Sequence, residues 1–111
     1  MPLFALLLLA CDGAADPCPA MCQAAAPLVL TCLEAEGLDW GAAGYADEGA
    51  FLESCETWAW QARLLERDAG EEGAVDATCE ARAASFEAAL TDPAAPDCAA
   101  WTEVRWEEMP W

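Results

Sequence analysis

The chain has 111 residues, and its 21 acidic side chains face only four arginines, no lysine and no histidine, which gives a net charge of −17. Hydrophobic residues make up 57% of it, but more than half of these are alanine or cysteine, so the core must be thin. This length sets one small domain as the ceiling and excludes a multidomain enzyme or a large cofactor fold. The negative field excludes nucleic-acid binding, and the lack of histidine removes the usual proton carrier and zinc ligand.

An apolar run from Leu3 to Ala10 opens the chain and ends at Cys11, which a turn-prone Asp12 and Gly13 follow. The run is too short to span a bilayer. The sequence Leu8-Leu9-Ala10-Cys11 resembles the lipobox of bacterial lipoprotein precursors, in which a lipid is attached to the cysteine sulfur and the chain is cleaved just before it. The resemblance covers about a tenth of the chain and implies a signal peptide over residues 1–10, a lipidated Cys11 and a tether over residues 11–15. A conventional signal cleaved after Ala15 and a buried apolar N-terminus are the alternatives.

The first predicted helix begins after Asp16, a good N-cap residue, with Pro17 at its first position, and runs to about Glu36. No charged residue occurs between positions 18 and 33, so we expect this helix in the middle of a bundle. Sixteen uncharged residues with an internal Pro27 fit a membrane span poorly, and the proline should bend or divide the helix. Its expected inward stripe is Cys18, Cys22, Ala25, Val29, Cys32 and Leu33.

Glycines at 37, 41 and 44 then predict a loop that carries Trp40 and Tyr45. A second helix is expected over residues 47–69, with Phe51, Cys55, Trp58, Ala62, Leu65 and Ala69 facing inward. After a turn at residues 70–73, a third helix is expected over residues 74–90, with Val75, Cys79, Ala83, Phe86 and Leu90 inward. Asp92-Pro93 stops it, and Asp97 can cap a last, irregular helix that contains Cys98, Trp101, Val104 and Trp106. Residues 16–111 are therefore predicted to form an all-α fold, a small disulfide-stapled bundle of three to four helices.

Seven cysteines is an odd number, and assigning Cys11 to the lipid leaves an even set for three disulfides in an exported chain. If the first two long helices are antiparallel, Cys32 lies level with Cys55, and the returning third helix brings Cys79 near Cys22. Cys98 then remains for Cys18, which gives a nested pairing of 18–98, 22–79 and 32–55. A tight hairpin after Pro93 would instead place Cys98 at the opposite end of the bundle.

A soft metal or redox site is the alternative for the cysteines, because Cys18, Met21 and Cys22 share one helical patch that suits Cu(I). The C-x-x-x-C spacing is not that of a zinc knuckle or a thioredoxin-like motif, and structural disulfides are the favoured interpretation. No metal or other cofactor is therefore predicted. Carboxylate pairs that could serve as acid and base, Glu53 with Glu56 and Glu103 with Glu107, lie on predicted solvent faces. We expect a solvated acidic shell and no enzyme.

Tryptophan is abundant, with six residues in 111. Trp58 belongs to the inward stripe of its helix, whereas Trp60 points to the opposite side, near Arg63 and Arg67. Trp60 is expected either to be shielded by Arg63 through a cation–π contact or to belong to a binding face. The tail rings Trp101, Trp106 and Trp111 are expected to pack over the bundle or to contact a partner.

The sequence thus predicts a lipid-anchored protein of the bacterial cell envelope, outside the cytoplasm, with a structural or protein-interaction role. Its expected partners are a membrane, reached through the lipid on Cys11, and a basic protein surface that complements the acidic shell. A small ligand- or metal-binding envelope protein is the alternative.

Overall fold

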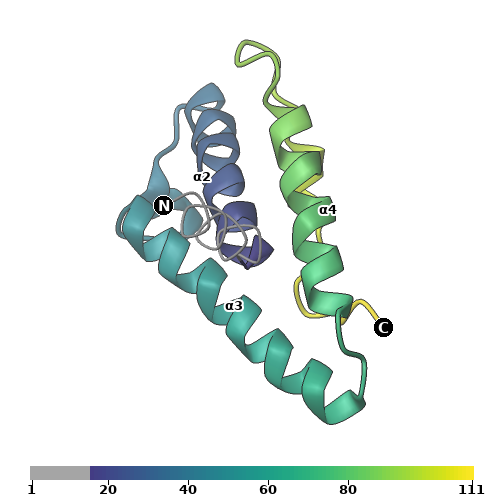
Figure 1. Cartoon of the computed structure of the whole chain (residues 1–111). Coiled ribbons are helices and arrows are strands. Elements are labelled where there is room, and N and C mark those ends of the chain that lie inside the picture. The colour runs from purple at the N-terminus through teal and green to yellow at the C-terminus, as the bar shows by residue number, and fades with distance from the viewer. Residues whose placement is uncertain (1–15) are drawn as a thin grey trace, which may run out of the picture.

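The computed structural model describes residues 16–111, and the predicted signal peptide and tether lie outside them. Within this range the chain is all-α, as expected, with three long helices, two short ones and no strand (Figure 1). The long helices are α2 (Pro17–Ala35), α3 (Glu48–Ala69) and α4 (Ala74–Ala89). The short ones are the 3₁₀ helix η1 (Trp40–Ala43) and α5 (Ala99–Thr102).

The helix boundaries follow the capping signals of the sequence. Asp16 accepts a hydrogen bond from the backbone N–H of Cys18 at 2.8 Å, and Asp47 accepts one from Ala50 at 2.8 Å. Gly70 ends α3 with a backbone φ of 71°, a left-handed conformation that glycine adopts without strain. Helix α2 continues through Pro27 and is not divided there. The predicted helices are therefore confirmed to within about a residue at these ends.

Helices α2 and α4 run side by side in the same direction, while α3 crosses obliquely beside the lower end of both (Figure 1). The interior between α2 and α4 is built mostly of small side chains, with Phe86 and Met21 among the few large ones. By length and composition, α2 is the one described helix that could cross a membrane. It is also the element against which α3, α4, α5 and η1 all pack, so it forms the core of this bundle.

All six cysteines after Cys11 form disulfides, but the nested pairing is wrong. The bonds join Cys18 to Cys79, Cys22 to Cys55, and Cys32 to Cys98. The antiparallel hairpin expected for the first two helices does not form, because the connection over residues 36–47 returns along α2 before α3 begins (Figure 1). Cys55 therefore meets Cys22, ten residues below Cys32 on α2, which is about 15 Å along a helix.

Cys32, near the C-terminal end of α2, therefore bonds to Cys98, as the tight-hairpin alternative implied. Two hydrogen bonds form that hairpin. The side chain of Asp92 accepts one from the backbone N–H of Ala94 at 3.0 Å, and the N–H of Asp97 donates one to the carbonyl oxygen of Ala89 at 2.9 Å. Each disulfide ties α2 to a different element, namely α4, α3 and the segment that leads into α5. Three disulfides in so small a domain indicate an oxidising compartment outside the cytoplasm.

The C-terminal half of α3 departs from the predicted core. Leu65 was expected to face inward but is 50% exposed, and Ala69 is exposed as well. Figure 1 shows the reason, because α3 diverges from α2 toward its C-terminus. The first turn of α4 contacts this stretch through Val75 and Asp76 but leaves Leu65 uncovered. Leu90, at the end of α4, is only partly buried, and Ala89 is buried instead.

Candidate functional site

An open cleft lies between α3 and the C-terminal tail. It has a volume of about 280 Å³ and is lined by Tyr45, Phe51, Ser54, Cys55, Trp58, Trp101 and Trp106. Helical periodicity predicts Phe51 and Trp58 in the core and leaves the other rings in a loop and a tail. It did not predict that they would come together, because four separate segments contribute to the cleft.

The aromatic rings of the cleft support one another. Phe51, almost fully buried, lies at the centre, with ring centroids 5.1 Å from Trp40, 5.3 Å from Tyr45 and 5.3 Å from Trp101. Trp101 also contacts Phe86 of α4 at 5.7 Å. The arrangement is therefore a rigid aromatic wall anchored on two long helices.

The tail is held on this wall by a hydrogen bond as well as by ring contacts. Trp58 donates its indole N–H to the carbonyl oxygen of Trp106 at 2.7 Å, and the two rings meet edge to face at 5.1 Å. Trp106 contacts Trp101 at 5.1 Å. Of the three tail tryptophans named from the sequence, Trp101 and Trp106 pack on the bundle, and Trp111 is 40% exposed.

Arg82 of α4 places a positive charge over two of these rings. Arg82 was not among the site residues predicted from the sequence. Its guanidinium carbon lies 5.0 Å from the Trp58 ring centroid and 4.7 Å from that of Trp106. Its Nη1 is buried without a hydrogen-bond partner in the described part of the chain, and desolvation lowers the pKa of Arg82. A guanidinium remains charged even so, and the π faces replace part of the lost solvation.

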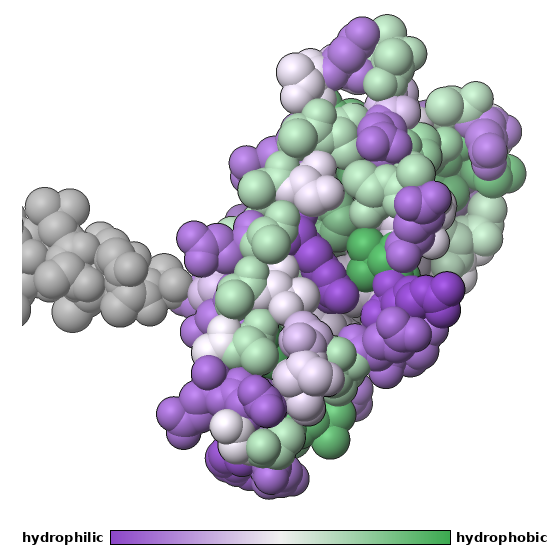
Figure 2. Space-filling view, turned by 90° about the vertical axis from the view of Figure 1, so that its right-hand side faces the viewer, coloured by the Kyte–Doolittle hydropathy of each residue, from purple (hydrophilic) through white to green (hydrophobic). Residues whose placement is uncertain are grey.

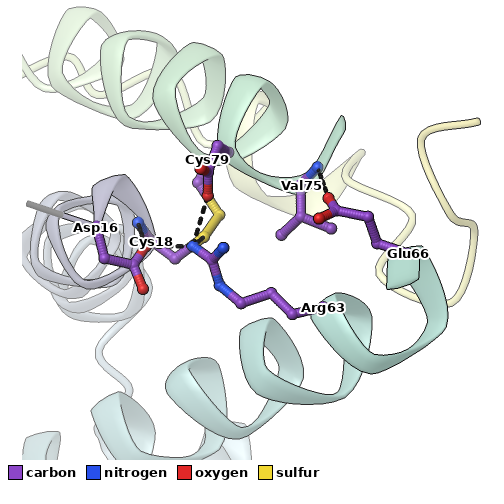
Figure 3. A network of polar contacts seen from close by, with 7 residues as sticks. Asp16, Cys18, Arg63, Glu66, Val75 and Cys79 are labelled. Carbon is purple, nitrogen blue, oxygen red and sulfur yellow. Dashed lines mark hydrogen bonds and ion pairs between the residues drawn. A yellow bond between two sulfur atoms is a disulfide. The ribbon is translucent and has the colours of Figure 1, made fainter. Parts of the chain in front are cut away.

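Arg63 has a different role from the one expected. It does not shield Trp60 by a cation–π contact, because its Nη2 pairs with the carboxylates of Asp16 and, at 2.6 Å, Asp76 (Figure 3). The same nitrogen lies 3.3 Å from the sulfur of Cys18. Desolvation acts to lower the pKa of Arg63, but the hydrogen bond to Asp76 and the charges of both carboxylates outweigh it and raise the pKa. Arg63 thus holds the first residue of the described chain against α3 and α4.

One turn further along α3, Glu66 completes this polar network. Its Oε2 accepts a hydrogen bond from the backbone N–H of Val75 at 2.6 Å (Figure 3). Helix α4 has no side-chain cap of its own, since Gly73 precedes it, so Glu66 supplies the missing acceptor and a favourable charge at its N-terminus.

Trp60 is the most exposed large hydrophobic residue of the described chain, with 63% of its surface accessible. It borders a second hollow of about 260 Å³, lined by Asp16, Cys18, Pro19, Glu56, Ala59, Trp60 and Arg63. Arg67, named with it from the sequence, is exposed and does not line the hollow. Trp58 and Trp60 are two residues apart on a helix, so the hollow and the aromatic cleft lie on nearly opposite sides of α3.

The cysteines and acidic residues considered for a metal or catalytic role lie in disulfides or on the surface of the described chain. Cys18 and Cys22 are both consumed in disulfides, so their sulfurs are not thiolate ligands beside Met21. Asp16, Cys18 and Asp76 gather within metal-ligand distance, but the Arg63 guanidinium already pairs with both carboxylates, and the Cys18 sulfur is bonded to Cys79. Glu53, Glu56, Glu103 and Glu107 are all exposed.

Figure 2 shows the outer face near α4 and the tail, where hydrophilic side chains are spread among moderately apolar ones. Strongly hydrophobic residues form small separate spots on that face. Comparison with known proteins assigns no relationship, because no protein-family model, curated protein or solved structure matches the chain.

Proposed function

We propose that the protein is a lipid-anchored envelope protein of bacteria that binds a basic protein segment in its aromatic cleft. The anchor rests on the lipobox-like residues that end at Cys11 and on the pairing of the other six cysteines among themselves. The observation that carries the binding role is the open cleft walled by five aromatic rings in a chain of net charge −17.

The chemistry of the cleft selects the kind of partner. No charged side chain lines it, and the polar groups of its lining side chains are the hydroxyls of Ser54 and Tyr45 and the indole N–H groups of its tryptophans. Aromatic faces attract arginine and lysine, and aromatic pockets that exclude water are typical centres of binding energy in interfaces. Arg82 already lies over Trp58 and Trp106, so a cationic side chain of the partner would contact Tyr45 and Trp101. The surrounding acidic shell favours approach of a basic surface and disfavours an acidic one. A partner that presents an arginine or lysine among apolar residues fits both features.

The test uses a variant that fills the cleft without removing any of its rings. Ser54 is exposed on α3 and lines the cleft, so Ser54→Phe should block it. Ser85→Phe, the same change at an exposed position of α4 outside the cleft, is the matched control. Basic and acidic peptides of equal length are titrated while tryptophan fluorescence is measured at low and high salt.

We expect the basic peptide to bind the wild type and the Ser85→Phe variant, and to bind Ser54→Phe about tenfold more weakly, which corresponds to about 1.4 kcal/mol. High salt should weaken binding, because the attraction between charged surfaces is screened. Equal binding of both variants, or equal binding of both peptides, contradicts the proposal.

The anchor is tested separately in cells. Cys11→Ala should release the domain from the detergent phase into the soluble fraction, and the mass of the wild-type N-terminal peptide should include a lipid. A soluble wild type with unmodified Cys11 contradicts the anchor and leaves the cleft experiment valid.

A small organic ligand is the second candidate, because a volume of about 280 Å³ is close to the lower end of ordinary ligand pockets. A stoichiometric small molecule that purifies with the wild type and with Ser85→Phe, but is lost from Ser54→Phe, would favour this candidate over a protein partner.

A further inference from the structure

We propose that the hollow at Trp60 rests on the membrane and that Trp60 inserts into the interfacial layer of zwitterionic lipids. This inference rests on the proposed lipid anchor and adds to it a defined side of the domain that faces the bilayer.

The hollow lies next to the point where the tether joins the domain. Asp16, the first described residue, lines the same hollow as Trp60. Asp16 is the fifth residue after Cys11, and five extended residue steps span at most about 17 Å. A lipid on Cys11 therefore keeps this hollow within about 17 Å of the bilayer surface, at a high effective concentration.

The point where the tether joins the domain is held against α3. Arg63, three residues after Trp60 on α3, pairs with both Asp16 and Asp76, and the adjacent Cys18 is bonded to Cys79 (Figure 3). The chain thus leaves the domain at a point fixed against α3, beside the Trp60 ring. Any membrane held by the tether is held on this side.

The side chains of the hollow suit the headgroup layer of a zwitterionic membrane. An indole ring combines an apolar body with an N–H donor and favours the headgroup layer of a membrane. Glu56, which is exposed and takes part in no ion pair of the described chain, lines the hollow beside Trp60. An ammonium headgroup can contact both this carboxylate and the indole face. The net charge of −17 opposes anionic lipids, so zwitterionic phosphatidylcholine or phosphatidylethanolamine fits best.

This orientation also agrees with the proposed cleft. Trp58 lies nearly opposite Trp60 around α3, so a domain that rests on Trp60 turns its aromatic cleft away from the bilayer. A partner in the envelope then reaches the cleft without competing with lipid.

The experiment supplies the anchor chemically, so that its outcome does not depend on lipidation in cells. The described helices, the three disulfides and the described core lie within residues 16–111, so a chain that begins at Cys11 retains all of them. Its Cys11 thiol is coupled to a maleimide-bearing lipid in phosphatidylcholine vesicles. The six tryptophans are labelled with fluorine for NMR, and Trp60→Phe assigns the Trp60 line.

We expect spin-labelled headgroups to remove most of the Trp60 signal and to leave the Trp111 signal largely intact. Trp60→Ala should reduce binding of the uncoupled domain to phosphatidylcholine vesicles severalfold, whereas Leu65→Ala, a change at another exposed apolar side chain of α3, should not. Spin-labelled vesicles that also contain an anionic lipid should broaden the Trp60 line less than spin-labelled vesicles of phosphatidylcholine alone.

Several results would overturn the inference. One is a Trp60 line that spin-labelled lipid broadens no more than the Trp111 line. Another is a Trp60 line that shifts with protein concentration in the absence of vesicles, which would assign the ring to a second copy of the chain. A third is a Trp60 line that only the basic peptide perturbs, which would make Trp60 part of a protein interface. If spin-labelled lipid broadens the Trp60 line but Cys11 carries no lipid in cells, the result would support the hollow at Trp60 as a membrane-binding surface and contradict the proposed lipid anchor.

Discussion

The α2–α4 side of the bundle and the α3–tail side solve the problem of a thin core in different ways. Between α2 and α4 the buried residues are mostly small, among them Ala25, Ala26 and Val29, and the helices are joined covalently by Cys18 and Cys79. On the α3–tail side, rings around Phe51 and Trp101 fill the interior. Small side chains let two helices approach closely but bury little area, so the first side depends on disulfides, whereas the second depends on aromatic area.

The largest expected effect comes from reducing all three disulfides. They close loops with sequence separations of 61, 33 and 66 residues, for which the chain-entropy relation gives about 4 kcal/mol each. That total approaches the whole stability of a small domain. We expect reduction to abolish the cooperative thermal transition seen by circular dichroism. A reduced protein that melts within a few degrees of the oxidised one would show that the α2–α4 side does not depend on its disulfides.

The aromatic side is tested by Phe51→Ala, which removes the ring at the centre of the cleft wall. Loss of a fully buried phenylalanine costs about 3–5 kcal/mol. Chemical denaturation should show this loss with the disulfides intact, and the fluorescence of the tail tryptophans should shift toward that of exposed indole. A loss below about 1 kcal/mol would contradict the idea that aromatic area holds this side together.

The close approach of α2 and α4 is tested by Ala25→Leu. Ala25 is fully buried, so the added carbons must push the two helices apart or strain the neighbouring disulfides. Overpacking of this kind costs about 1–3 kcal/mol. Ala20→Leu, at an exposed position of the same helix, should leave the midpoint of denaturation nearly unchanged and serves as the control.

The polar network at Arg63 should contribute less. Arg63→Met keeps much of the side-chain volume and removes the ion pairs with Asp16 and Asp76, which are partly exposed and screened. We expect a loss of about 1 kcal/mol or less, and less again at high salt. A loss that does not change with salt would mean that Arg63 acts through packing.

Trp60 should have the smallest effect on folding. Trp60→Ala is expected to change the free energy of unfolding by less than about 0.5 kcal/mol, because most of the ring is exposed to solvent and little of it packs against the core. A larger loss in denaturation experiments would show that Trp60 is a structural residue and would weaken its assignment to the membrane surface.

The sequence predicted features that depend on neighbouring residues, and it failed for those that depend on how helices cross. Asp16, Asp47 and Gly70 mark helix ends by local hydrogen bonding and backbone conformation, and these ends are confirmed. The pairing of Cys55 depended on the path of the 36–47 connection, which periodicity does not describe. The burial of Leu65 failed for the same reason, because it assumed that a neighbouring helix covers all of α3.

The candidate site shows the same division. Periodicity separated Trp58 from Trp60 correctly, since one contacts the tail and the other is exposed. Arg82 could not be assigned from spacing, because its ring partners lie 24 residues before and 24 residues after it. Its only sequence signal was its place in a chain with just four arginines, where each positive charge should have an acidic or aromatic partner.

Disulfide mapping of the unreduced protein tests the central claim, that α2 is stapled separately to α4, α3 and the segment before α5. Cleavage after glutamate puts Cys55, Cys79 and Cys98 on separate peptides, cyanogen bromide separates Cys18 from Cys22 at Met21, and chymotrypsin can cleave between Cys22 and Cys32. Mass spectrometry should find Cys18 with Cys79, Cys22 with Cys55, and Cys32 with Cys98. Recovery of Cys32 joined to Cys55, or of Cys18 joined to Cys98, would contradict this arrangement of the helices.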